Sequence, residues 1–78
     1  MPTQADLIRQ SLLANDPEYR QLAEEHLRCE SQLKEILDEP YRNSEDLALE
    51  VILKKKKLHL RDQMEYIVSQ HQHHLVHH

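Results

Sequence analysis

The sequence predicts an all-α fold, an antiparallel two-helix hairpin of coiled-coil type preceded by a short N-terminal helix. Ala, Glu, Lys, Leu and Arg supply close to half of the 78 residues, a composition typical of long helices. The chain has no Gly, no Trp and no Phe, so the turn glycines and most of the aromatic residues that β-rich folds use are missing. Its apolar residues also recur in steps of three and four, which is the period of a helix.

The first helix is expected over residues 4–13. Thr3 followed three residues later by Asp6 resembles a capping box, a reciprocal pair of hydrogen bonds that starts a helix. The apolar members of this helix are Ala5, Leu7, Ile8, Leu12 and Leu13. They give the helix one apolar side, which we expect to need a partner surface.

The second helix is expected over residues 17–39. Asp16 is suited to cap it, and Pro17 fits the first helical position, where no backbone N–H is needed. Pro40 ends it, because its ring disfavours helical geometry in the preceding residue. The seam residues, in alternating steps of three and four, are Tyr19, Leu22, His26, Cys29, Leu33 and Ile36.

A turn at residues 40–44 leads to a third helix over residues 45–69. Asn43 or Ser44 can cap that helix, with two acidic residues in its first turn. So short a connection returns the third helix antiparallel to the second. Its expected seam residues are Leu49, Leu53, Leu60, Met64 and Ile67.

Four consecutive lysines, Lys54–Lys57, stand in the third helix of a chain with net charge −4. Successive helical residues are about 100° apart, so these four cannot form one basic face. A turn centred on residues 41–42 places Lys57 opposite Glu25 and His26. We therefore expect Lys57 to lie along the apolar seam and to reach a carboxylate, with Glu24 and Glu25 as the candidates.

Residues 1–70 are expected to form one domain, and residues 71–78 a histidine-rich tail. Spacing of four residues lets two imidazoles share a divalent ion on a helix, which makes weak metal candidates of four histidines. They are His73, His74, His77 and His78. No Cys, Asp or Glu accompanies them to complete a site, so we expect no bound metal and no cofactor.

The residues offer no constellation for catalysis. Cys29 and His26 are three residues apart, but no third group orients them as a nucleophile and base would require. We therefore interpret Cys29 as a small buried hydrophobe and His26 as a polar layer that sets the register of the hairpin. Without a catalytic constellation or a glycine-rich phosphate loop, we expect no enzyme and no small-molecule substrate. The lone cysteine, the absence of a membrane span and the lack of a signal-peptide pattern indicate a cytoplasmic protein.

Three segments carry a resemblance to a known family: "NDPEYRQLAEEHLRCESQL" at 15–33, "DEPYRNSEDL" at 38–47 and "LKKKKLHLRDQMEYIV" at 53–68. With these segments the chain resembles the YdcH-like family, small bacterial helical-hairpin proteins grouped as a domain of unknown function. The resemblance implies an antiparallel helical hairpin and no assigned activity. The histidine-rich tail departs from the family pattern.

Several apolar residues fall outside the hairpin seam: Leu27, Leu37, Leu47, Val51 and Leu58. Two helices alone cannot cover them. One solution is that the N-terminal helix folds back over the hairpin, and the other is an interface through self-association or with another protein; the two are compatible. The second option predicts a protein-interaction or structural adaptor module. Two alternatives stay open: a weak nucleic-acid or ribonucleoprotein accessory using Lys54–Lys57 and Arg61, although net acidity argues against it, and metal binding by the tail.

Overall fold

Three helices make up nearly all of the chain. A computed structural model describes the backbone of residues 1–76 and the side chains of residues 1–73. The helices are α1 (Gln4–Asn15), α2 (Pro17–Asp38) and α3 (Ser44–Val76). Since residues 1–76 contain no strand, the predicted all-α class is confirmed for the described part of the chain.

The helix starts follow the local signals in the sequence. At α1, the Asp6 backbone N–H donates to Thr3 Oγ1 at 3.1 Å and the Thr3 N–H donates to Asp6 Oδ2 at 3.0 Å, which confirms the capping box. Hydrogen bonding of the Asp6 carboxylate to the backbone and then the side chain of Thr3 lowers the pKa of this carboxyl below its ordinary value. At α3, Asn43 is the cap: its Oδ1 accepts from the Asp46 N–H at 2.8 Å, and Asp46 Oδ2 accepts from the Asn43 N–H at 3.3 Å.

Asp16 joins α1 to α2 and serves both helices. Its N–H donates to the Leu12 carbonyl at 2.8 Å, while its Oδ1 accepts from the N–H groups of Glu18 and Tyr19. Pro17 restricts Asp16 to an extended conformation, observed at φ −111° and ψ 107°, so α1 cannot continue into α2. The predicted cap at Asp16 is confirmed.

The Arg20 guanidinium stabilises the same junction. It donates to the carbonyls of Leu13 and Ala14, both at 2.9 Å. These carbonyls belong to the last turn of α1, where no further helical N–H is available to them. With these bonds α1 extends to Asn15, two residues beyond the predicted end at residue 13.

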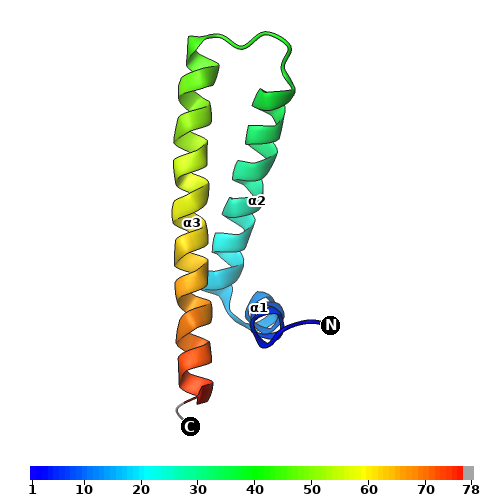
Figure 1. Cartoon of the computed structure of the whole chain (residues 1–78), viewed down its shortest axis with the longest axis vertical. Helices are drawn as coiled ribbons and strands as arrows, with labels where there is room; N and C mark the ends of the chain where they lie inside the picture. Colours follow the sequence, from blue (N-terminus) through cyan, green and yellow to red (C-terminus); the bar gives the residue numbers. More distant parts are fainter. Residues whose placement is uncertain (77–78) are drawn as a thin grey trace.

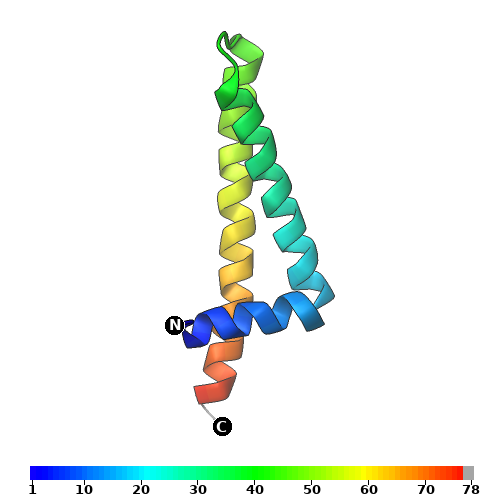
Figure 2. The same cartoon turned by 90° about the vertical axis from the view of Figure 1, so that its right-hand side faces the viewer.

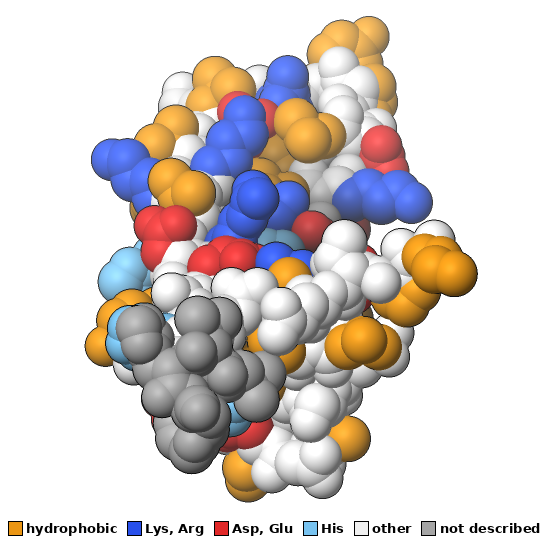
Figure 3. Space-filling view, turned by 60° about the horizontal axis from the view of Figure 1, so that its bottom comes forward, with side chains coloured by type: hydrophobic (Ala, Val, Ile, Leu, Met, Phe, Trp, Pro, Cys, Tyr) orange, Lys and Arg blue, Asp and Glu red, His pale blue; other side chains and the backbone are white. Residues whose placement is uncertain are grey.

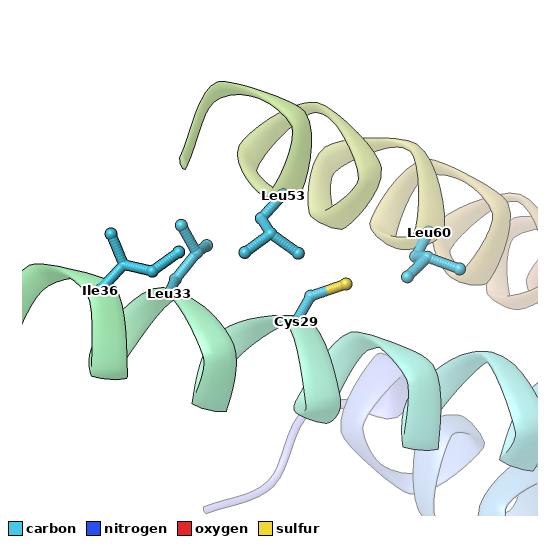
Figure 4. Packing of buried hydrophobic residues seen from close by; sticks show 5 residues of the cluster. All are labelled: Cys29, Leu33, Ile36, Leu53 and Leu60. Carbon is cyan, nitrogen blue, oxygen red and sulfur yellow. The ribbon is translucent and has the colours of Figure 1, made fainter. Parts of the chain in front are cut away.

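Helices α2 and α3 lie side by side, joined by residues 39–43 (Figure 1). Their first hydrophobic core is formed by Cys29, Leu33 and Ile36 of α2, which point toward Leu53 and Leu60 of α3 (Figure 4). Leu22 packs against this cluster while partly exposed. Each buried member is no more than 8% exposed, so this cluster is the contact that holds the two long helices together.

Helix α1 builds a second core where α2 and α3 diverge. In Figure 2 the two long helices separate away from their connection, and α1 crosses the open end. The buried residues there are Ile8, Leu12, Tyr19 and Val68, with Ala5, Met64 and Ile67 packed against them. Arg9 Nη2 adds contacts of 3.1 Å to both carboxylate oxygens of Glu65, and those bonds raise the pKa of the guanidinium. Helix α1 therefore packs against both long helices and completes a three-helix arrangement.

The packing of α1 differs from expectation in two respects. Leu7 and Leu13 remain 54% and 44% exposed, because only the side of α1 carrying Ile8 and Leu12 faces the other helices. The helix also covers the open end of the pair and leaves the five off-seam apolar residues uncovered. The N-terminal helix thus does not cover those residues.

The ends of the long helices also differ from the predicted bounds. Helix α2 stops at Asp38, since Glu39 is extended before Pro40, and the connection comprises residues 39–43. Helix α3 begins at Ser44 and runs to Val76, seven residues beyond the predicted end at residue 69. No Pro or Gly follows Ser69 to stop it, so most of the expected tail is helical.

The register of the long helices is shifted from the predicted one. Helix α3 has 33 residues and α2 has 22, and α3 continues past the end of α2 on the side of the connection (Figure 1). Leu49, predicted in the seam, is 43% exposed, although it stands one turn before the buried Leu53. The prediction for Leu49 is wrong because α2 has ended at that level and offers no opposing side chain.

Truncating one buried leucine of α1 tests whether this helix stabilises the fold. We expect Leu12→Ala to lower the free energy of unfolding by about 2–5 kcal/mol, because Leu12 is 4% exposed in the second core. Its neighbour provides the control: Leu13→Ala changes the exposed side of the same helix and should cost less than about 1 kcal/mol. Urea unfolding followed by circular dichroism measures both. Equal effects would contradict the packing of α1.

The second core also predicts a specific response to alkaline pH. Burial raises the pKa of the Tyr19 phenol above its ordinary value of 10.0. A pKa higher in the folded than in the unfolded state means that Tyr19 stabilises the fold fully below pH 10 and less as pH rises beyond it. We expect stability to fall more steeply above pH 10 in the wild-type chain than in Tyr19→Phe. Tyr41→Phe, at a 91% exposed position, is the control and should retain the wild-type slope.

Candidate protein-interaction face

A groove of about 770 Å³ runs between α2 and α3 on one side of the molecule. Its apolar residues are Leu33, Leu37 and Leu58, so leucine side chains from both helices supply its apolar surface. Its charged and polar residues are His26, Glu30, Lys34, Asp38, Lys54, Lys57 and Arg61. We call this surface the groove face. Four cationic side chains stand there against two carboxylates, in a chain whose net charge is negative.

Glu30 organises the polar part of the groove. Lys57 Nζ lies 3.3 Å from Glu30 Oε1, and His26 Nδ1 lies 3.8 Å from the same oxygen. His26 is one helical turn before Glu30 on α2, whereas Lys57 comes from α3. The Lys57–Glu30 pair therefore links the two helices beside their first core. Because both side chains are more than one third exposed, water screens the pair, and its contribution to stability is small.

The position of Lys57 confirms one part of the prediction and corrects another. Lys57 is partly buried beside the seam and reaches a carboxylate, as expected. Its partner is Glu30 and not Glu24 or Glu25, because the register is shifted by slightly more than one turn. Glu24 and Glu25 line a separate hollow of about 420 Å³ with Arg20 and Arg28, on α2 alone.

The other lysines of the cluster point in different directions. Lys54 lines the groove and lies 3.5 Å from Glu50, whose other oxygen accepts from Arg42 at 2.6 Å. Lys55 and Lys56 are exposed and do not line the groove. In the space-filling view of Figure 3, Lys and Arg side chains stand among hydrophobic and acidic ones. The four lysines thus do not act as one basic patch.

The predicted off-seam residues are all exposed, by 50–62%. Leu37 and Leu58 line the groove itself. Leu47 and Val51 precede Leu58 on α3 at intervals that keep all three on one side of the helix. Leu27 stands three residues before Glu30 on α2, at the outer margin of the same side. The structure therefore places Leu37 and Leu58 in the groove, and helical spacing puts the other three on or beside the same face.

The seam predictions fall into two groups. His26 is partly buried next to the first core, while Tyr19, Met64 and Ile67 contact α1 in the second core. Val68, which is 2% exposed, was missed because a heptad count for two helices leaves no position for a residue facing a third. A signal was present, since Val68 continues the four-residue spacing of Leu60 and Met64. Glu30 was missed as the partner of Lys57 because the assumed register placed it elsewhere.

The histidine-rich end of α3 supports no metal site in the part of the chain that is described. Within that part, no three His, Cys, Asp or Glu side chains come close enough together to hold a metal ion. His73 lies in α3, while the side chain of His74 and residues His77 and His78 lie outside the described residues. Metal binding by the tail stays a prediction.

Among the described residues, none of the helices has a stretch long and apolar enough to span a bilayer. No family model, curated protein or solved structure gives a significant match to this chain.

The Lys57–Glu30 pair predicts that one lysine of the cluster differs from its neighbours. A double-mutant cycle with Lys57→Ala and Glu30→Ala should give a coupling free energy of about 0.5 kcal/mol that decreases at high salt. Lys56→Ala, at an exposed position outside the groove, is the control and should show no coupling to Glu30→Ala. Equal coupling for both lysines would contradict the observed register.

Proposed function

We propose that this chain is a non-catalytic protein-interaction module, a small structural adaptor that binds through the groove face. The observation that carries the proposal is the exposed apolar row of Leu47, Val51 and Leu58 beside Leu37 in the groove. Uncovered apolar side chains grouped on one face are typical of surfaces that bind another protein. The proposed architecture is an antiparallel hairpin of coiled-coil type, with α1 crossing the end at which the two long helices diverge.

The mixed chemistry of the groove face supports a protein as the ligand. Leucines from both helices supply apolar surface, and the ion pairs around Glu30 and Glu50 set charges at fixed places along it. Apolar burial supplies affinity in such an interface, while charges govern orientation and the choice of partner. We also propose that the chain belongs to the YdcH-like family and acts in the cytoplasm.

A nucleic-acid role for the lysine cluster receives less support. A phosphate-binding surface needs several cations directed at one backbone, but Lys54 and Lys57 are paired with Glu50 and Glu30. Lys55 and Lys56 stand off the groove face. The observations therefore favour an interface with protein.

Crosslinking in cells tests the proposal. We expect crosslinked protein adducts of the wild-type chain to be strongly reduced by Val51→Ser and by Leu58→Ser, since each change places a hydroxyl in the apolar row. Ile52→Ser is the matched control, because Ile52 is 60% exposed on the same helix but on another side. Adducts that persist in both row variants, or that are lost equally in the control, would contradict the proposed face.

A further inference from the structure

The groove face matches the chemistry of a segment of the same chain. Helix α3 begins beyond the end of α2, and its first two turns carry the exposed Leu47 and Val51. Each is preceded by an acidic residue, Asp46 and Glu50 respectively. This start of α3 is therefore an acidic amphipathic helix, in which Glu50 also pairs with Arg42 and Lys54. The groove presents leucines beside Lys34 and Arg61, the cations that remain once Lys54 and Lys57 are set against Glu50 and Glu30.

The segment cannot reach the groove of its own molecule. Residues 44–76 form one continuous helix, so the start of α3 is held in line with the residues that line the groove, Lys54–Arg61. Within one chain the row of Leu47, Val51 and Leu58 only extends the groove along α3. Contact between the acidic segment and the cationic groove thus requires two molecules.

The distribution of charge along the chain indicates how the two molecules are oriented. Residues 38–50 contain five acidic residues and one arginine, and residues 51–61 contain four lysines, one arginine and no acidic residue. Two copies aligned in parallel would place like charges opposite one another. A two-fold axis between residues 54 and 55 of α3 instead places Glu50 of each copy opposite position 59 of the other, next to Arg61, twice in one interface.

We propose that the ligand of the groove face is a second copy of this chain, bound antiparallel. The start of α3 of each copy lies in the groove of the other, with Val51 next to Leu58 of the second copy. The two α2–α3 pairs then form a four-helix arrangement, with the α1 helices at its outer ends. This inference rests on the proposed function and names the partner of that face.

The size of the molecule is compatible with such an interface. A standard protein interface takes about 800 Å² from each partner, about an eighth of the 6203 Å² surface of this chain. The molecule is 54 Å long, so a face along the α2–α3 pair extends over most of that length. A domain of this size also has a small core of its own, which makes burial of the exposed row by association a substantial gain.

Sedimentation equilibrium of the purified full chain tests the association. We expect a dimer whose dissociation constant rises about tenfold or more in Val51→Ser and in Leu58→Ser, with α-helix content unchanged by circular dichroism. Ile52→Ser should leave the dissociation constant unchanged. A wild-type chain that stays monomeric to millimolar concentration would overturn the inference, as would equal weakening by all three variants.

Disulfide trapping tests the orientation. In a Cys29→Ser background, mixing Val51→Cys and Leu58→Cys chains should yield mainly the mixed disulfide between the two variants. A preference for Val51→Cys pairing with itself would indicate a parallel arrangement and overturn the antiparallel one. In that background Ile52→Cys is the control, which should not crosslink to either variant at comparable rates.

The outcome also separates this inference from the proposed function. A monomeric chain whose cellular adducts are still lost in Val51→Ser and Leu58→Ser would retain the interaction face and overturn only the second copy as its ligand. The acidic amphipathic helix would then belong to another protein. If Val51→Ser and Leu58→Ser reduce neither the self-association nor the cellular adducts, the inference and the proposed function are both overturned.

Discussion

The unequal length of the two long helices is the constraint on which the rest of the structure depends. Helix α3 has 33 residues and α2 has 22, so α2 can cover only part of α3. At the end away from the connection α1 crosses and buries Val68. At the connection end no helix of the described chain opposes the start of α3, and Leu49 stays exposed. Leu47 and Val51 are exposed on the side of Leu58, away from the side that faces α2. The mismatch thus produces the second core at one end and an uncovered apolar segment at the other.

The sharp junction at Asp16 allows α1 to serve as the covering element. One carboxylate caps α2 while the backbone of the same residue closes α1, and Pro17 prevents the two helices from merging. Had α1 and α2 formed one helix, Ile8 and Leu12 would extend along the α2 axis, away from Val68. A local backbone restriction therefore decides where a second core can form.

Local features of this fold could be predicted from the sequence, whereas the pairing of the helices could not. The caps at Thr3 and Asp16 depend on residues within one turn, and they are observed as predicted. Register depends on where α2 stops and on the path of residues 39–43, which no periodicity encodes. A turn centred on residues 41–42 placed Lys57 opposite Glu25 and His26 instead of Glu30, and the four-residue step to Leu53 placed Leu49 in the seam. Val68 was not predicted as a core residue because it faces a third helix, α1.

The same shift of register determines the chemistry of the groove face. It brings Lys57 to Glu30 and leaves Lys54 and Arg61 beside the leucines, so cations of α3 line an apolar groove. A charged group beside buried apolar surface disfavours any partner that cannot offer an opposite charge at that place. The start of α3 carries Asp46 one position before Leu47 and Glu50 one position before Val51. The overhang at the start of α3 thus also supplies the segment that we propose binds the groove of a second molecule.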